Sequence, residues 1–216
     1  MDAPDRGAAG LVSSKRTAKG TPIKLTPLSI AVGIALGVII LVLSACGASD
    51  EPGSEAGTPT GTDFDRAFID AMVPHHEGAI AMARTAKEAG LSQPDLVQVA
   101  DDILRTQQRE IDRMKEWREQ WFGSSTIEPD GADALGLSES QMGMEHDPDA
   151  LQASGDVDTD FAQMMITHHQ GAIAMAELAR ENAEHQEIED LAETIIESQE
   201  AEIEVLRRHS TGMQHE

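Results

Sequence analysis

The sequence predicts an all-α protein, a four-helix bundle built from two duplicated helical hairpins. Residues 74–83 and 167–176 are identical at eight of ten positions and lie 93 residues apart. Apolar residues recur at steps of three and four in four segments, which is typical of amphipathic helices, and no alternating strand pattern competes. Two hairpins that each carry one apolar stripe bury it by packing together, so we expect a pseudo-twofold axis between them.

An export signal is predicted at the start of the chain. Residues 1–26 are polar and basic, and an uncharged apolar stretch follows over residues 27–45. It ends in Leu-Ser-Ala-Cys, which resembles the lipobox of bacterial lipoproteins, where the cysteine is lipidated and becomes the new N-terminus. We therefore predict a signal peptide with a lipobox over residues 1–46 and a lipid on Cys46, which anchors the protein to the outer face of the cell membrane. An uncleaved membrane helix is the alternative, because about 20 apolar residues can cross a bilayer.

The chain after this leader is strongly acidic. It holds 11 of the 16 Lys and Arg residues and 37 of the 39 Asp and Glu residues. Such a charge repels nucleic acid and anionic lipid, so we exclude both as binding partners. It would attract cations, but it is equally the charge of a well-solvated surface. Residues 47–62 contain Gly, Ser, Thr, Pro and acids without a large apolar side chain, which predicts a flexible tether.

The first repeat is predicted to form a helical hairpin over residues 63–121, the first part of a bundle over residues 63–208. Its first helix begins near Asp63 or Asp65, since either can cap a helix, and ends at Gly90, which suits a left-handed C-terminal cap. The second helix begins after Ser92 and runs to about Trp121. The inward faces comprise Phe68, Met72, His75, Ala79, Met82 and Ala86 in the first helix and Leu96, Val99, Ala100, Ile103, Gln107, Met114 and Trp117 in the second.

The second repeat is predicted to copy the first over residues 156–208. Its first helix runs from about Asp158 to Arg180, and Asn182 stands where Gly90 stood, as another residue that tolerates the left-handed conformation. Residues 122–155 are predicted to be a linker, and residues 209–216 a C-terminal tail. The last helix presents Ile188, Leu191, Ala192, Ile195, Gln199, Ile203 and Leu206 to the core.

A polar layer is predicted in the middle of the bundle. At 100° per residue, the first histidine of each pair falls at the centre of the apolar face, the second falls at its edge, and the next residue points to solvent. The predicted layer comprises His75, His168, Gln107, Glu110, Gln199 and Glu202, flanked by Met72, Met82, Met165 and Met175, with Glu77 and Gln170 pointing outward. Buried polar groups there must be hydrogen-bonded or metal-bound, because leaving one unpaired costs about 1–3 kcal/mol.

Two interpretations of this layer stay open. In the first, each histidine donates to a Glu or Gln across the bundle, and methionines fill gaps in the core. In the second, histidine nitrogens and methionine sulfurs bind a transition metal, and this soft ligand set favours copper, above all Cu(I). The predicted ligands are Met72, His75, His76, Met82, Met165, His168, His169 and Met175. Additional ligands or supporting groups are sought among Gln107, Glu110, Gln199, Glu202, Met142, Met144 and His146, with His209, Met213 and His215 near the C-terminus.

The pattern Asp-x-x-Phe-x-x-Met-x-x-His-His-x-x-Ala-Ile-x-Met-Ala resembles the domain of unknown function 305, also called the CopM-like family. The resemblance covers about residues 63–208. The matching residues are Asp65, Phe68, Met72, His75, His76, Ala79, Ile80, Met82 and Ala83, and Asp158, Phe161, Met165, His168, His169, Ala172, Ile173, Met175 and Ala176. The resemblance implies a ferritin-like helical fold and an exported protein. Because some members are associated with copper binding and resistance, it also implies copper as the ligand.

Three functions follow from these observations. The leading hypothesis is a membrane-anchored, extracytoplasmic protein that buffers copper or hands it on, with another transition metal as an open choice. The alternative is a metal-free helical scaffold or partner-binding module. A metal-dependent enzyme of ferritin-like type ranks third, because only Glu110 and Glu202 are placed to supply carboxylate ligands.

Overall fold

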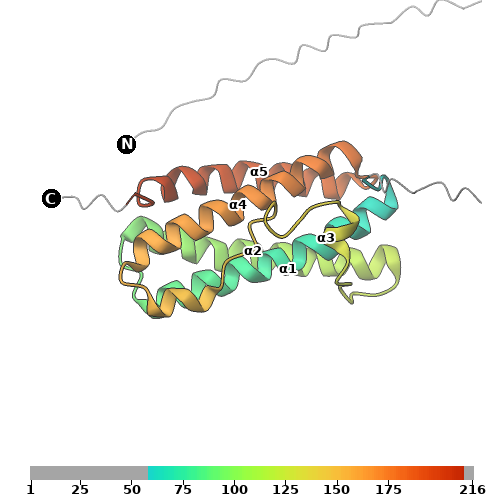
Figure 1. The fold of residues 1–216 in the computed structure, drawn as a ribbon. Coiled ribbons are helices and arrows are strands. Elements are labelled where there is room, and N and C mark those ends of the chain that lie inside the picture. Colours follow the sequence, from blue (N-terminus) through green and yellow to red (C-terminus); the bar gives the residue numbers. More distant parts are fainter. Residues whose placement is uncertain (1–57, 212–216) are drawn as a thin grey trace, which may run out of the picture. The chain divides into compact units, whose positions relative to one another are not determined.

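Four long helices form a bundle in the computed structural model, which describes residues 58–211. They are α1 (Thr62–Ala89), α2 (Pro94–Phe122), α4 (Val157–Asn182) and α5 (Gln186–Arg207). α1 packs along α2, α4 packs along α5, and α1 also packs along α4 (Figure 1). The prediction of an all-α bundle made of two hairpins is confirmed. Cys46 and the predicted signal peptide lie outside the described residues. Within residues 58–211, no helix is long and apolar enough to cross a membrane.

The helix ends follow the sequence prediction only in part. Gly90 terminates α1 in the left-handed conformation with φ of 105°, as expected. Asn182 does not play this part, because it is the last residue of α4 and the following Ala183 is extended. α1 begins at Thr62, before both acids proposed as its cap, and Asp65 is buried against the other hairpin. These ends depend on contacts between the hairpins, which a local cap rule does not include.

The segment between the repeats is more than a connection. It contains α3 (Gly131–Ala134) and a 3₁₀ helix, η1 (Pro148–Ala153), and both contact α1. Leu135, Met142 and Leu151 of this segment are buried. It crosses the face of the bundle formed by α1 and α4 (Figure 1). We call residues 142–146 of this segment the strap.

The core consists of two apolar clusters on either side of the predicted polar layer. In α1, buried apolar residues within 64–73 belong to one cluster and those within 82–86 to the other, with the histidine pair between them. α4 runs in the opposite direction, so its residues 161–165 join the second cluster and residues 172–179 the first. The histidines therefore occupy a polar layer between the two apolar clusters.

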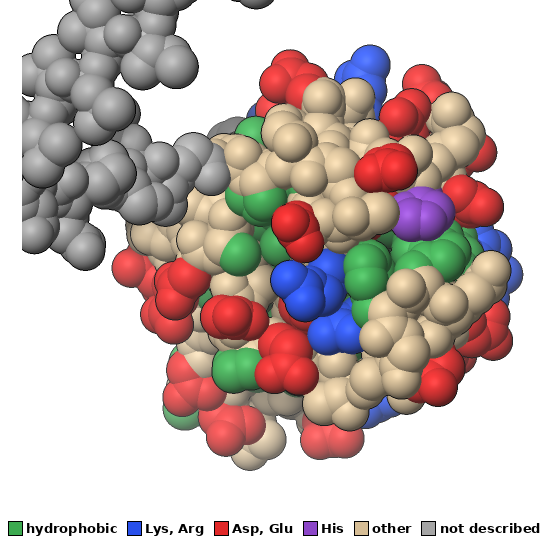
Figure 2. All heavy atoms as spheres, turned by 90° about the vertical axis from the view of Figure 1, so that its right-hand side faces the viewer, with side chains coloured by type: hydrophobic (Ala, Val, Ile, Leu, Met, Phe, Trp, Pro, Cys, Tyr) green, Lys and Arg blue, Asp and Glu red, His purple; other side chains and the backbone are tan. Residues whose placement is uncertain are grey.

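Charges are unevenly divided between the interior and the surface. Figure 2 shows one end of the molecule, where many Asp and Glu side chains surround smaller basic and hydrophobic areas. Inside the bundle, Arg118 donates to the Asp70 carboxylate at 3.0 Å from Nε and 3.2 Å from Nη2, and both residues are buried. Arg118 also donates from Nη1 to the carbonyl of Ser124 at 3.1 Å, so this pair ties α1 to the end of α2.

Candidate metal centre

The two histidine pairs lie in the interior, midway along α1 and α4. Each of the four side chains is at most 2 % exposed. The rings of His75 and His168 lie against each other, with centroids 3.8 Å apart and planes 40° from parallel. The prediction that these two histidines meet at one level of the bundle is confirmed. Glu77 and Gln170 are exposed, as expected, and Glu77 accepts from Lys115 at 2.9 Å.

Three of the four histidines have one ring nitrogen held by an acceptor. His75 donates from Nε2 to the carbonyl of Met142 at 2.8 Å. His76 donates from Nε2 to Glu110 at 2.9 Å, and His169 donates to Glu202 at 2.7 Å. These acceptors fix the tautomer, because a ring that donates from Nε2 in its neutral form carries its lone pair on Nδ1.

The carboxylates pair with different histidines from those that the hairpin heights suggested. Glu110 and Glu202 were expected level with the central histidines, His75 and His168. They bind instead the second histidine of each pair, which lies at the edge of the apolar face and points towards the partner helix of its own hairpin. The central histidines, at the middle of the face, point across to the other hairpin.

Several buried polar atoms in this layer have no hydrogen-bond partner. All four histidines leave Nδ1 unpaired, and His168 leaves Nε2 unpaired as well. The side-chain oxygens of Gln107 and Gln199, both buried, are also unpaired. Burying a polar atom without a hydrogen-bond partner costs about 1–3 kcal/mol of stability. So many unpaired atoms in one layer therefore indicate that a ligand binds there.

Electrostatics keep the two central histidines neutral. Burial, with a smaller contribution from the neighbouring His76, lowers the pKa of His75 to about 3. Burial also holds the pKa of His168 well below its usual value, with His75 and His169 adding to the effect. A neutral imidazole is the form that binds a metal ion, so neither ring must lose a proton to become a ligand.

The methionines predicted as ligands lie on both sides of the histidine layer. Met72 and Met175 belong to one apolar cluster, and Met82 and Met165 to the other, all four buried. The structure therefore brings one methionine from each repeat to each side of the layer. Within residues 58–211, no group of three or more His, Cys, Asp or Glu side chains is arranged to hold a metal. The predicted ligand set combines imidazole with thioether instead.

The additional candidate ligands lie in different parts of the molecule. Met142 is buried in an apolar cluster, Met144 is half-buried, and His146 is exposed. His209 lies at the end of α5 and bonds to Asp95 at 2.9 Å, about 18 Å along α2 from the level of Gln107. The other two C-terminal candidates, Met213 and His215, lie outside the described residues.

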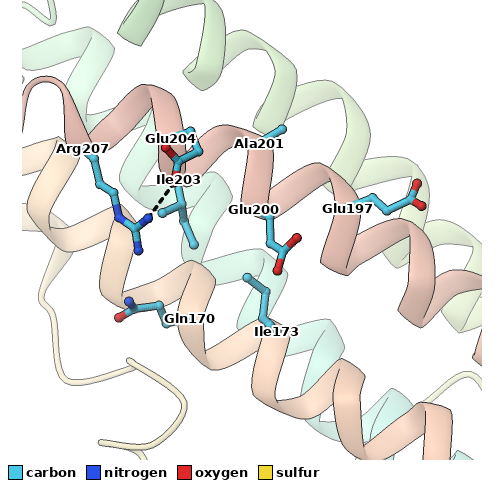
Figure 3. A pocket seen from close by; sticks show the side chains of 8 residues that line it. All are labelled: Gln170, Ile173, Glu197, Glu200, Ala201, Ile203, Glu204 and Arg207. Carbon is cyan, nitrogen blue, oxygen red and sulfur yellow. Dashed lines mark hydrogen bonds and ion pairs between the residues drawn. The ribbon is translucent and has the colours of Figure 1, made fainter.

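A surface hollow of about 670 Å³ between α4 and α5 contains none of the histidines (Figure 3). Glu197, Glu200 and Glu204 border it, and Glu204 is paired with Arg207 at 2.6 Å. Its acidic rim is separate from the histidine layer, so we do not count it as part of the centre.

Sequence reasoning missed the glycine that follows each histidine pair. A Cβ on Gly171 would overlap the carbonyl group of Met142, so the strap can lie on α4 only because residue 171 has no side chain. Gly78 holds the same position in α1 and faces His168 and Met144. The sequence did contain a signal for this contact. A glycine inside a helix costs about 1 kcal/mol relative to alanine, so a glycine that recurs at the same position in both repeats indicates close packing there.

Comparisons with known proteins agree with this fold and motif. Residues 46–94 and 91–210 match the family described as domain of unknown function, DUF305. The chain belongs to the DUF305 family. It is 37 % identical to CopM in the Cu(I)-bound form, over 67 % of this chain and 93 % of that one, with a TM-score of 0.57. It is 34 % identical to CopM in the apo form, over 70 % and 98 % of the two chains, with a TM-score of 0.59.

Other structures of the family extend this likeness. CopM is also known in Cu(II)-bound and Ag-bound forms. A DUF305 protein from Streptomyces coelicolor is 23 % identical over 66 % of this chain and 89 % of its own, with a TM-score of 0.60, which supports the DUF305 fold alone. No curated protein matches the chain.

Proposed function

We propose that this DUF305 protein is a membrane-anchored, extracytoplasmic copper-binding protein that buffers the ion or hands it on. Its nitrogen ligands are His75, His76, His168 and His169, and its sulfur ligands are Met72, Met82, Met165 and Met175. Three further groups accept hydrogen bonds from Nε2 of the histidines: Glu110 from His76, Glu202 from His169 and the carbonyl of Met142 from His75.

One observation carries the proposal: four buried Nδ1 atoms lack partners, while three of the same rings donate from Nε2 to fixed acceptors. Metal-binding histidines typically donate their other N–H to a carboxylate or a backbone carbonyl, which orients the ring and raises its basicity. Thioether sulfur next to imidazole suits Cu(I), and imidazole alone also accepts Cu(II). CopM, which has been determined with Cu(I), Cu(II) and Ag, provides independent support.

The test is a metal titration of the purified full-length protein with Cu(I), Cu(II) and Zn(II), followed by elemental analysis and thermal unfolding. Binding to the native state alone raises stability by about 2.7 kcal/mol at a hundredfold excess of free ligand over Kd. Replacing His75 and His168 by Ala should abolish the tightest copper sites. His209→Ala is the matched control, because His209 is bonded to Asp95 away from the layer. A melting temperature that ignores all three ions would contradict the proposal.

A metal-free scaffold is the second candidate, and the bonds from His76 to Glu110 and from His169 to Glu202 favour it, since they would also stabilise a bundle without metal. It predicts that His76→Ala lowers thermal stability while added copper has no effect. A metal-dependent enzyme has weaker support, because both carboxylates of the layer already accept from histidines.

The location is a proposal from the leader sequence, with residues 1–46 as signal peptide and lipobox, residues 47–62 as tether and the bundle outside the membrane. Mass spectrometry of the mature N-terminus tests it. We expect a lipid on Cys46 in the natural protein and an unprocessed or released protein for Cys46→Ala. An intact leader in the natural protein would rule out the lipoprotein assignment.

A further inference from the structure

The strap makes the two central histidines unequal. His75 and His168 hold equivalent positions in the repeats, but of the two only His75 donates from Nε2 to the Met142 carbonyl. His168 is 2 % exposed and leaves both ring nitrogens without a partner. One copy of the strap serves two copies of the motif, so the open nitrogen, His168 Nε2, has no counterpart on His75.

A thioether of the strap and this open nitrogen approach the same position on α1. A Cβ built on Gly78 would lie 3.2 Å from His168 Nε2 and 3.9 Å from the sulfur of Met144. Both atoms therefore approach the same point on α1, in space that exists because residue 78 carries no side chain. An imidazole nitrogen and a thioether sulfur at one point are a ligand pair for a soft cation.

The same place has a connection to the surface. Met144 is half-buried, and His146, two residues further along the strap, is exposed. His146 borders a hollow of about 350 Å³ together with Met164 and Thr167, the residue before His168. His146 is also among the groups that lower the pKa of His168, which agrees with its lying close by. Sulfur and imidazole groups thus run from the surface to the interior.

We propose that Met144 and His168 Nε2 form an outer site for a soft monovalent cation, Cu(I) or its redox-inert analogue Ag(I), through which the ion reaches the buried histidine layer. The inference rests on the proposed copper function and adds the place of entry. His146 and Met164 line the approach, and the ion passes from Met144 and His168 Nε2 to the unpaired Nδ1 atoms of the histidine layer.

The experiment compares Met144→Leu with Met114→Leu in the full-length protein. Both variants remove one thioether and nearly conserve volume. Met144 lies beside the position on α1 that His168 Nε2 approaches, whereas Met114 is buried in an apolar cluster on α2. Bound Ag(I) is counted by equilibrium dialysis, and Cu(I) loading is followed without oxygen by competition with bicinchoninate. We expect Met144→Leu to lose one Ag(I) equivalent and to load Cu(I) at least tenfold more slowly, with Cu(II) binding unchanged. Met114→Leu should match the natural protein.

The outcomes separate this proposal from the copper function. If the natural protein binds Ag(I) and Cu(I) but Met144→Leu does so with equal count and rate, the outer site is refuted and the buried centre stands. If both variants lose the same amount, the loss comes from altered packing, and the outer site is also refuted. If the natural protein binds neither ion, both proposals fail. Methionine methyl NMR gives a second readout, since the Met144 resonance should shift with the first Ag(I) equivalent.

Discussion

Asp65 and Asp158 hold the same position in the two repeats, and each binds the helical turn of the other repeat. Asp158 accepts from the backbone N–H of Ser92 at 2.8 Å and of Gln93 at 3.1 Å, just before α2. Asp65 accepts from the N–H of Glu184 at 3.1 Å and of His185 at 3.0 Å, just before α5. The aspartate of the repeated motif therefore fastens the two hairpins to each other.

Replacing Asp65 or Asp158 by Ala should destabilise the bundle. Losing a cap costs about 0.5–2 kcal/mol, and the buried Asp65 should cost more because its N–H partners stay unpaired. The free energy of unfolding in urea measures both. His185 bonds to Asp65 and stacks on Trp121 with centroids 3.8 Å apart, so only Asp65→Ala should also change tryptophan fluorescence. Equal stability of both variants and the natural protein would contradict the exchanged caps.

The glycines after the histidine pairs should differ in tolerance, although they are equivalent in sequence. Gly171→Ala should destabilise the protein by about 1–3 kcal/mol, since its Cβ meets the backbone of the strap, which cannot rotate away. Gly78→Ala meets only ends of side chains, the nearest at 3.2 Å, and alanine favours the helix, so its effect should be small. Chemical denaturation of the two variants provides the comparison. A larger loss for Gly78→Ala would show that the strap does not depend on Gly171.

Stability of the metal-free protein should fall as the pH drops from 7 to 5. The pKa of His75 is lowered to about 3 in the folded state, against 6.5 as the ordinary value, so the unfolded state binds the proton first. The stabilisation is complete above pH 6.5 and is lost progressively towards pH 3, by about 2 kcal/mol for one such histidine between pH 7 and 5. Urea unfolding with a chelator present measures this slope.

His75→Gln should reduce that slope, and His146→Gln is its control because His146 is exposed. The carboxyl group of Asp158 does not add to the slope in this range: burial alone would raise its pKa, but hydrogen bonds from Ser92 and Gln93 lower it. An unchanged slope in His75→Gln would mean that His75 is not held neutral in the bundle.

Removing one partner of the buried ion pair between Asp70 and Arg118 should lower the free energy of unfolding. Arg118→Met leaves a buried carboxylate without its partner, which typically costs about 3–5 kcal/mol. Adding Asp70→Leu to that variant should recover most of the loss, since an apolar pair of similar size needs no desolvated charge. Unfolding free energies of the two single variants and the double variant form a complete cycle. Additive losses would contradict direct pairing.

Replacing Met72 and Met165 by Leu should weaken Cu(I) binding more than Cu(II) binding. The change nearly conserves volume and should cost less than about 1.5 kcal/mol of stability, so it isolates the sulfur atoms. Competition titrations with a Cu(I) chelator and a Cu(II) chelator give the two affinities. Equal weakening of both ions would indicate altered packing in place of lost thioether ligands.

The sequence predicted the bundle and its polar layer because both depend on periodicity. The steps of three and four, present in both repeats, place His75 and His168 inward regardless of the path of the loops. The pairing of Glu110 was predicted less well, because height along a hairpin does not determine how far each helix is rotated about its axis. The edge position of His76 turns it towards α2, and Glu110 meets it there.

The path of the linker could not be predicted by the same means. Residues 122–155 have no sustained period, and their position depends on tertiary contacts, such as the carbonyl of Met142 against Gly171. The left-handed Gly143, with φ of 67°, permits the close approach that follows. The asymmetry between His75 and His168 arises from this path, and an exact repeat alone would have predicted two identical sites.

The division of the core into two clusters has a consequence for how the helices are aligned. Apolar side chains alone would let one hairpin slide along the other by a helical turn, about 5.4 Å, and still find apolar neighbours. Such a slide would press the imidazoles of one hairpin against the Ala and Met side chains of the other and separate the ring of His75 from that of His168. Because the imidazoles interrupt the apolar stretch at the middle of both inward faces, we infer that they set the register in which the two halves of the molecule assemble.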